Sequence, residues 1–155
     1  MNNEMDDFSI KPGYANIYGL IGSTANEIVA AKRMLSSMTP TIITHKDSLY
    51  ALLGSPGGAT IITTVAQVIS NIIDHKMNIR EAIEAPRFHH QWTPDTLYVE
   101  KYGFIRDVKI NLENKGHLVQ IIGTLGDVQG ILFDPVTGNW TGWSDPRGNG
   151  VCLGY

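Results

Sequence analysis

The chain has 155 residues, of which 43% are hydrophobic and 17% charged, and its net charge at pH 7 is −3. This balance is typical of a globular domain with a sizeable core, so we predict a single domain over residues 1–155 rather than disorder. The sequence has no cluster of Lys and Arg of the kind that binds nucleic acid, and it has no apolar run long enough to span a membrane. The single cysteine, Cys152, excludes an internal disulfide.

The first segment, residues 1–33, is rich in Asn, Asp and Gly and is predicted to be mostly loop, with at most short strands around 17–21. It begins with a dense acidic run in which the carboxylates of Glu4 and Asp7 could converge and bind an ammonium group. On composition alone, solvated acids at a chain end are the commoner outcome.

Ser36 and Ser37 form a pair of hydroxyls just before the next predicted strand. Adjacent hydroxyls together with backbone N–H groups can hold a carboxylate. Such serines more often serve only as turn or cap residues, so the residues themselves leave both interpretations open.

Two β-prone runs, 41–44 and 49–53, flank a turn-like tetrapeptide and predict a hairpin. Apolar residues spaced three and four apart over 61–73 then predict a long helix with a broad apolar face. The other predicted elements are a helix over 79–84 with Asn78 as its N-cap, a strand over 97–100, a helix over 106–115, a strand over 118–122, and a hairpin of strands 130–133 and 140–143. This order predicts a layered α+β sandwich.

The run Gly54-Ser55-Pro56-Gly57-Gly58 joins the first hairpin to the long helix. The first N–H groups of a helix have no intrahelical partner, and paired glycines let a ligand approach the backbone closely. Such a turn suits an anion, or an oxygen that becomes an anion during acyl transfer. A tight strand-to-helix turn without a ligand fits the same five residues equally well.

The segment Phe88-His89-His90-Gln91-Trp92 contains two adjacent histidines, which raises the hypothesis of a metal site. Neighbouring side chains in an extended segment point to opposite faces, and the spacing supplies no third ligand. We therefore predict no metal site and no cofactor, and assign packing and hydrogen-bonding roles to His89, His90 and Trp92.

Taken together, several segments in order resemble γ-glutamyltranspeptidase, a family of N-terminal-nucleophile hydrolases, along nearly the whole chain. The segments that carry the resemblance are Asn2-Asn3-Glu4-Met5-Asp6-Asp7-Phe8-Ser9, Lys11-Pro12-Gly13, Leu35-Ser36-Ser37-Met38-Thr39-Pro40-Thr41, Gly54-Ser55-Pro56-Gly57-Gly58, Ile61-Ile62-Thr63-Thr64, Ala85-Pro86-Arg87-Phe88-His89-His90-Gln91-Trp92, Asp145-Pro146-Arg147 and Gly154-Tyr155. Each is short, but their order and spacing together are highly specific.

The resemblance implies an αββα sandwich and an enzyme that moves the γ-glutamyl group of glutathione to water, an amino acid or a peptide. In that family a precursor cleaves itself, and the new N-terminal threonine of the small subunit forms an acyl-enzyme. The resemblance assigns Glu4 and Asp7 to the α-ammonium of the glutamyl group and Ser36 and Ser37 to its α-carboxylate. It assigns the oxyanion hole to the backbone of Gly57-Gly58.

The family places its nucleophilic threonine before the Asn-Asn-Glu-Met-Asp-Asp stretch, inside which this sequence starts. We therefore expect no catalytic nucleophile in residues 1–155, no activity from them alone, and a partial sandwich without the N-terminal strands and the large subunit. The large subunit and the N-terminal segment are the expected partners, and a sheet edge left open is expected to favour homo-oligomers. The family is typically periplasmic or extracellular.

Two other interpretations stay open. One is a non-catalytic glutamyl-binding or interaction module descended from the enzyme. The other is an amidase or acylase of the same fold with a different substrate, against which the matched glutamate-pocket residues argue.

Overall fold

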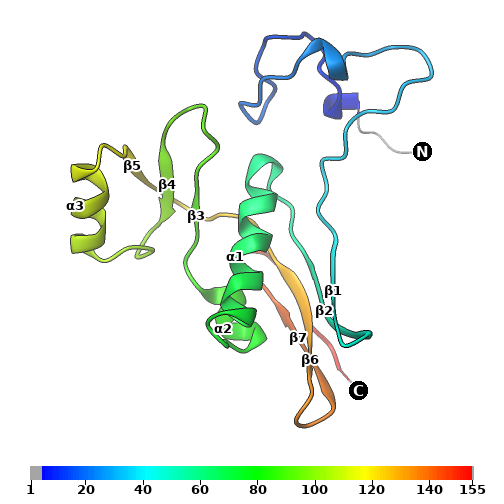
Figure 1. Ribbon diagram of the computed structural model, residues 1–155, viewed down its shortest axis with the longest axis vertical. Helices are drawn as coiled ribbons and strands as arrows, with labels where there is room; N and C mark the ends of the chain where they lie inside the picture. Colours follow the sequence, from blue (N-terminus) through cyan, green and yellow to red (C-terminus); the bar gives the residue numbers. More distant parts are fainter. Residues whose placement is uncertain (1–4, 155) are drawn as a thin grey trace. The chain divides into compact units, whose positions relative to one another are not determined.

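The computed structural model describes residues 5–154, and the chain divides into two compact units, Met1–Met38 and Thr39–Tyr155 (Figure 1). Within the described residues, the α-helices and the strands all belong to the second unit, and the first holds two short 3₁₀ helices. The mixture of helices and strands agrees with the predicted α+β class. No helix among the described residues is both long and apolar enough to cross a membrane.

The first unit is built from turns, as its composition predicts. Its 3₁₀ helices are η1 (Met5–Asp7) and η2 (Thr24–Asn26). In place of the short strands expected near the middle of this unit there is an isolated bridge between Ala15 and Ile21. The side chain of Asn16 accepts two backbone N–H groups there and closes the chain into a turn, which leaves no room for an extended ladder.

The second unit contains a four-stranded antiparallel sheet. Its strands are β1 (Thr41–His45), β2 (Ser48–Gly54), β6 (Gln129–Asp134) and β7 (Asn139–Ser144), in the order β1-β2-β6-β7. Both predicted hairpins are confirmed, with strands one or two residues longer than the β-prone runs. The register of the first hairpin shifts at Ile43/Thr44, which marks a bulge.

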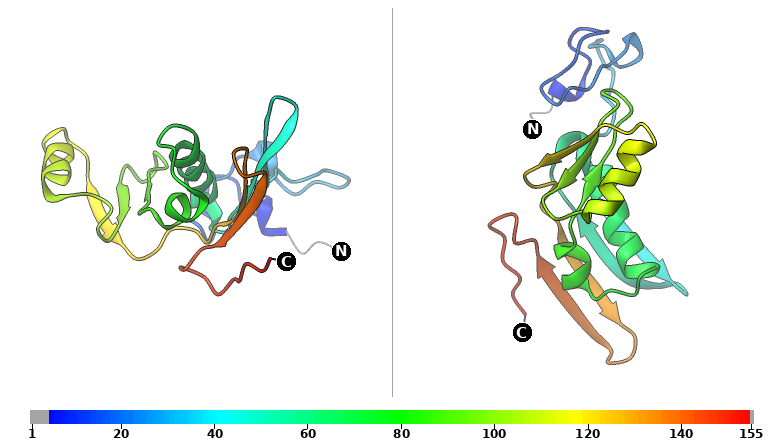
Figure 2. Two further views of the ribbon diagram at one scale, coloured as in Figure 1. Left: turned by 90° about the horizontal axis from the view of Figure 1, so that it is seen from below. Right: turned by 90° about the vertical axis from the view of Figure 1, so that its left-hand side faces the viewer.

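Two helices, α1 (Ile61–Ile73) and α2 (Ile79–Glu84), cover one face of this sheet (Figures 1 and 2). Both have the predicted bounds. The core between helices and sheet consists of Leu53, Ile61, Val65, Val68, Ile72, Ile79, Ala82, Ile83 and Val128. Asn78 caps α2 through a capping box with Glu81, which confirms the predicted N-cap.

A smaller sheet lies beside this core and holds β3 (Phe88–His89), β4 (Leu97–Glu100) and β5 (Val119–Ile122), in that order. The pairing of β4 with β5 is parallel, and α3 (Arg106–Asn114) forms the crossover between them. Strand β3 is absent from the predicted elements because two residues are too few to give a periodic signal.

Candidate functional site

The glycine-rich turn leads from β2 into a 3₁₀ turn, η3 (Gly58–Thr60), and directly on into α1. Gly57 and Gly58 have φ values of 142° and 56°, which L side chains rarely adopt. No hydrogen bond from the N–H of either glycine is found among the described residues. Two available donors at the positive end of a helix can stabilise an oxygen that gains negative charge. The predicted position of the glycines at the start of the helix is confirmed.

A second loop packs against this turn and fixes its position. A methyl group added to Gly57 would come within 3.6 Å of the Cα of Gly126 and 2.6 Å of Thr60 Oγ1. The N–H of Asp127 donates to Ser55 Oγ at 3.0 Å, so the two loops are also hydrogen bonded. The loop around Gly126 therefore supports the glycine turn from within the same unit.

Four charged side chains form a buried network next to that supporting loop. Arg87 pairs with Asp145 at 2.6 Å, and only 2% of Arg87 and 1% of Asp145 is exposed. Arg147 pairs with Glu100 at 2.6 Å and with Asp145 at 3.1 Å. Because buried charges are tolerated only when paired and hydrogen bonded, each member depends on the others.

The network also binds the backbone of the supporting loop. Glu100 Oε1 accepts the N–H of Leu125 at 2.7 Å, and Asp145 Oδ2 accepts the N–H of Val128 at 2.9 Å. Gly126 lies between these two anchored positions. A continuous set of contacts thus runs from the buried charges through this loop to the glycine turn.

The two carboxylates of the network remain ionised at neutral pH. Burial alone would raise the pKa of Glu100, but hydrogen bonds from Arg147 and from two backbone N–H groups outweigh it and lower the pKa. Burial likewise opposes ionisation of Asp145, and hydrogen bonds from backbone N–H groups and Arg87 lower its pKa below the usual value. Burial lowers the pKa of Arg87. Burial would also lower the pKa of Arg147, but its hydrogen bonds to Glu100 and Asp145 outweigh that effect and raise the pKa.

The other predicted site residues belong to the first unit. Asp7 ends η1 and is half-buried, while Ser36 and Ser37 are exposed. The side chain of Asn26 lies between these two segments: it donates to the carbonyl of Asp7 at 2.6 Å and accepts the N–H of Leu35 at 3.0 Å. Glu4 lies outside the described residues. Asn26 therefore connects the backbone at Asp7 with the backbone at Leu35, the residue before the serine pair.

Gly57 and Gly58 belong to the second unit, so their assembly into one pocket with Asp7 and the serines stays a prediction. The sequence alone does not indicate a role for Asn26 or for the buried charges. Arg87 and Asp145 are 58 positions apart, and nothing local to either residue indicates the partner.

His89 and His90 differ in their surroundings. His89 is buried, with Nδ1 2.8 Å from Thr63 Oγ1 and Nε2 3.0 Å from Gln91 Oε1, whereas His90 is exposed and pairs with Asp95 at 2.9 Å. These contacts fit packing and hydrogen-bonding roles. Among residues 5–154, no three His, Cys, Asp or Glu side chains gather as a metal site would require.

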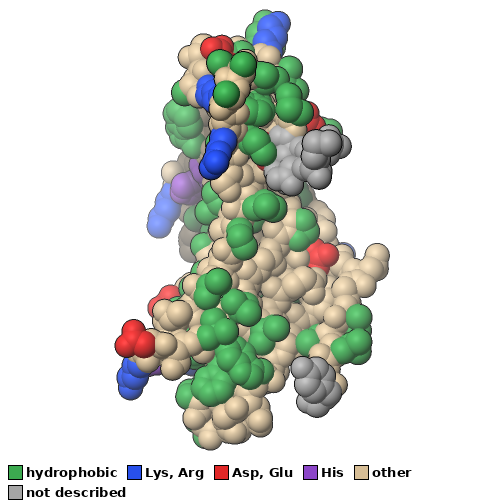
Figure 3. Space-filling view, turned by 90° about the vertical axis from the view of Figure 1, so that its right-hand side faces the viewer, with side chains coloured by type: hydrophobic (Ala, Val, Ile, Leu, Met, Phe, Trp, Pro, Cys, Tyr) green, Lys and Arg blue, Asp and Glu red, His purple; other side chains and the backbone are tan. Residues whose placement is uncertain are grey.

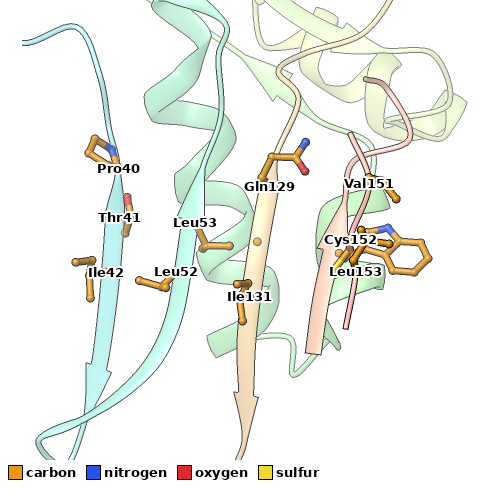
Figure 4. Close-up of a pocket in the computed structure, with 12 residues that line it drawn as sticks. Pro40, Thr41, Ile42, Leu52, Leu53, Gln129, Ile131, Val151, Cys152 and Leu153 are labelled. Carbon is orange, nitrogen blue, oxygen red and sulfur yellow. The ribbon is translucent and has the colours of Figure 1, made fainter. Parts of the chain in front are cut away.

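A shallow hollow of about 470 Å³ lies on the four-stranded sheet. Figure 4 shows its side chains coming from β1, β2, β6 and the C-terminal segment. Its lining is Pro40, Thr41, Ile42, Leu52, Leu53, Gln129, Gly130, Ile131, Trp143, Val151, Cys152 and Leu153, which is mostly apolar and includes none of the predicted site residues. Hydrophobic side chains also gather in patches on the face shown in Figure 3.

The glycine turn, whose two N–H groups meet no acceptor in the described part of the chain, is the kind of site that acyl-transfer enzymes use to stabilise an oxyanion. A family profile described as gamma-glutamyltranspeptidase matches residues 1–155, so the chain belongs to the γ-glutamyltranspeptidase family.

Relatives of known sequence agree with this assignment. The glutathione hydrolase proenzyme of Escherichia coli (strain K12) is 51% identical over 156 residues, which cover 100% of this chain and 27% of that protein. The corresponding proenzyme of Pseudomonas aeruginosa is 43% identical, with coverages of 99% and 28%. The chain thus spans about a quarter of the length of these curated relatives.

Solved structures agree as well. A mutant γ-glutamyltranspeptidase of Helicobacter pylori superposes with a TM-score of 0.90 at 54% identity, over 96% of this chain and 81% of that one. The Pseudomonas nitroreducens enzyme in complex with L-DON gives a TM-score of 0.88 at 41% identity, over 100% of this chain and 81% of that one. The predicted fold class, part of an N-terminal-nucleophile hydrolase sandwich, is confirmed by these matches.

Proposed function

We propose that residues 1–155 form part of an enzyme that transfers or hydrolyses the γ-glutamyl group of glutathione and related compounds through a threonine acyl-enzyme. The observation that supports this most directly is that the N–H groups of Gly57 and Gly58 have no partner among residues 5–154, in a chain that matches the family along its whole length. The matched relatives are named glutathione hydrolase proenzymes.

In this proposal, the backbone of Gly57-Gly58 stabilises the negative oxygen of the tetrahedral intermediate. Asp7, together with Glu4, holds the α-ammonium of the glutamyl group, and Ser36 and Ser37 hold its α-carboxylate. The attacking threonine and a large subunit come from parts of the proenzyme other than residues 1–155. We therefore expect residues 1–155 by themselves to release no chromophore from a γ-glutamyl anilide.

The rest of the proenzyme is also the proposed partner for the apolar hollow and for the outer strands β1 and β7. Both strands lie at the edges of their sheet, and Ile42 of β1 is 70% exposed. A sheet edge flanked by apolar side chains tends to pair with another chain. Residues 1–155 expressed alone should therefore self-associate, which light scattering over a dilution series would detect.

The proposed function is tested in a chimera in which residues 1–155 replace the matching segment of the Escherichia coli proenzyme. We expect the chimera to mature and to cleave a γ-glutamyl anilide. Gly57→Ala introduces a Cβ at a φ of 142°, 2.6 Å from Thr60 Oγ1, and should lower kcat about 10²-fold, the loss typical of a missing oxyanion donor.

Gly54→Ala is the matched control, because a Cβ at Gly54 meets no atom within 4 Å. This variant should keep kcat close to that of the parent chimera. A chimera that matures and binds glutamate but never turns over would contradict the proposal and favour the non-catalytic binding module.

A further inference from the structure

We propose that Asn26 is a positioning residue that fixes the spacing between the ammonium-binding and carboxylate-binding parts of the glutamyl pocket. The inference rests on the proposed function, since it concerns the residues that would hold the α-amino acid end of the substrate. The contacts that carry it all lie inside the first unit.

The side chain of Asn26 uses both ends of its amide on two segments far apart in sequence. Nδ2 donates to the carbonyl of Asp7 at 2.6 Å, across 19 positions, and Oδ1 accepts the N–H of Leu35 at 3.0 Å, across 9 positions. Leu35 directly precedes Ser36 and Ser37. One planar amide therefore connects the backbone at the acidic residue with the backbone at the serine pair.

The position of Asn26 itself is determined by backbone contacts that do not involve its side chain. Its N–H donates to the carbonyl of Ser23 at 3.1 Å, and its carbonyl accepts the N–H of Ser9 at 2.8 Å. Ser23 also caps η2 through its side chain, which accepts the N–H of Ala25. A truncated side chain at position 26 therefore removes the two bridging bonds and leaves these anchors in place.

The chemistry of the substrate explains why such a link matters. The α-ammonium and the α-carboxylate of a glutamyl group are bonded to the same carbon, so the groups that bind them must keep a fixed separation. The first unit has little apolar packing to maintain that separation: of its described residues only Ser9 is buried. Hydrogen bonds between the segments must take the place of a core, and Asn26 makes two of them.

The test measures donor discrimination in the chimera described above. Three donors share one leaving group: a γ-glutamyl donor, a glutaryl donor that lacks the α-amino group, and a 4-aminobutyryl donor that lacks the α-carboxylate. In the parent chimera, kcat/KM should be much higher for the γ-glutamyl donor than for either analogue. If the parent does not discriminate, the proposed function itself fails, whatever Asn26 does.

In Asn26→Ala we expect both discrimination ratios to fall about tenfold, while kcat/KM for the two truncated donors changes little. A role confined to folding would lower kcat/KM for the three donors alike and would leave the ratios unchanged, and that result overturns the inference. Asn26→Asp keeps an acceptor for the N–H of Leu35 but cannot donate to the carbonyl of Asp7, so it breaks the bridge at one end and should also lower both discrimination ratios. Unchanged ratios in Asn26→Asp would overturn the inference even if the alanine variant fails to mature.

Asn16→Ala is the matched control, because Asn16 lies in the same unit and its side chain also accepts backbone N–H groups, but only within its own turn. We expect its discrimination ratios to equal those of the parent. Equal losses of discrimination in Asn16→Ala and Asn26→Ala would also overturn the inference, since they would indicate a general loosening of the first unit.

Discussion

The two units of the chain keep their residues in place by different means. The second unit buries an apolar core between α1, α2 and the four-stranded sheet, and beside it a network of four charged side chains. The first unit relies on turns and on a few polar contacts such as those of Asn26. Substitutions that act on stability should therefore have large effects in the second unit, whereas those in the first should act mainly on substrate recognition.

The largest loss of stability is expected from breaking the buried charge network. Asp145→Asn removes the charge that faces Arg87 and Arg147 and leaves a buried guanidinium without full compensation. This should lower the free energy of unfolding by about 3–5 kcal/mol. Denaturant unfolding of the chimera, followed by circular dichroism, measures the change.

Glu113→Gln is the matched control, because it makes the same chemical change in an exposed pair with Lys109 on α3. We expect it to cost less than about 1 kcal/mol. Equal effects of the two substitutions would show that the network does not contribute more than a surface pair.

Acidification should weaken the same network. The pKa values of Glu100 and Asp145 are lowered in the folded state, so the unfolded state binds protons first as the pH falls. Their contribution is present above the unfolded pKa of about 4 and is lost as the pH falls through the lower folded values. Denaturation midpoints measured at pH 7 and pH 3 should differ more in the parent than in Glu100→Gln. A variant that keeps the full pH dependence of the parent would contradict this assignment.

A smaller effect is expected from the loop that connects the network to the glycine turn. Gly126→Ala places a Cβ at a φ of 69°, 2.7 Å from Ser55 Oγ and 2.8 Å from Thr64 Cγ2. We expect the left-handed backbone and the crowding together to destabilise the fold by about 2 kcal/mol. We also expect a lower kcat, because Ser55 belongs to the glycine turn.

Gly138→Ala separates these two causes, because Gly138 has a φ of 73° and open space where a Cβ would lie. It should cost about 1 kcal/mol and leave kcat unchanged. A drop in kcat confined to Gly126→Ala would show that the supporting loop controls the geometry of the turn.

The contrast between the units also explains what the sequence could predict. The period of apolar residues over α1 and the cap at Asn78 are local signals, and the predicted bounds of both helices are confirmed. The glycine turn is also a local signal, but its assignment as an oxyanion hole rests on the family resemblance, because a turn without a ligand fits the same five residues equally well. The partners of Arg87 and Asn26 were missed because each pairing joins distant segments, and a lone Arg or Asn in sequence carries no sign of what it contacts.

The smallest effect on stability is expected at the serine pair of the first unit. Ser36 and Ser37 are exposed, and within residues 5–154 the hydroxyl of Ser36 makes a single, long contact of 3.4 Å with the carbonyl of Met38. Alanine at either position should therefore change the free energy of unfolding by less than about 0.5 kcal/mol. Loss of a hydrogen bond to a carboxylate should nevertheless lower kcat/KM for the γ-glutamyl donor about tenfold or more. The 4-aminobutyryl donor lacks that carboxylate, so its kcat/KM should stay the same in Ser36→Ala and Ser37→Ala. Equal losses with both donors would mean that the serines stabilise the local backbone rather than bind the substrate.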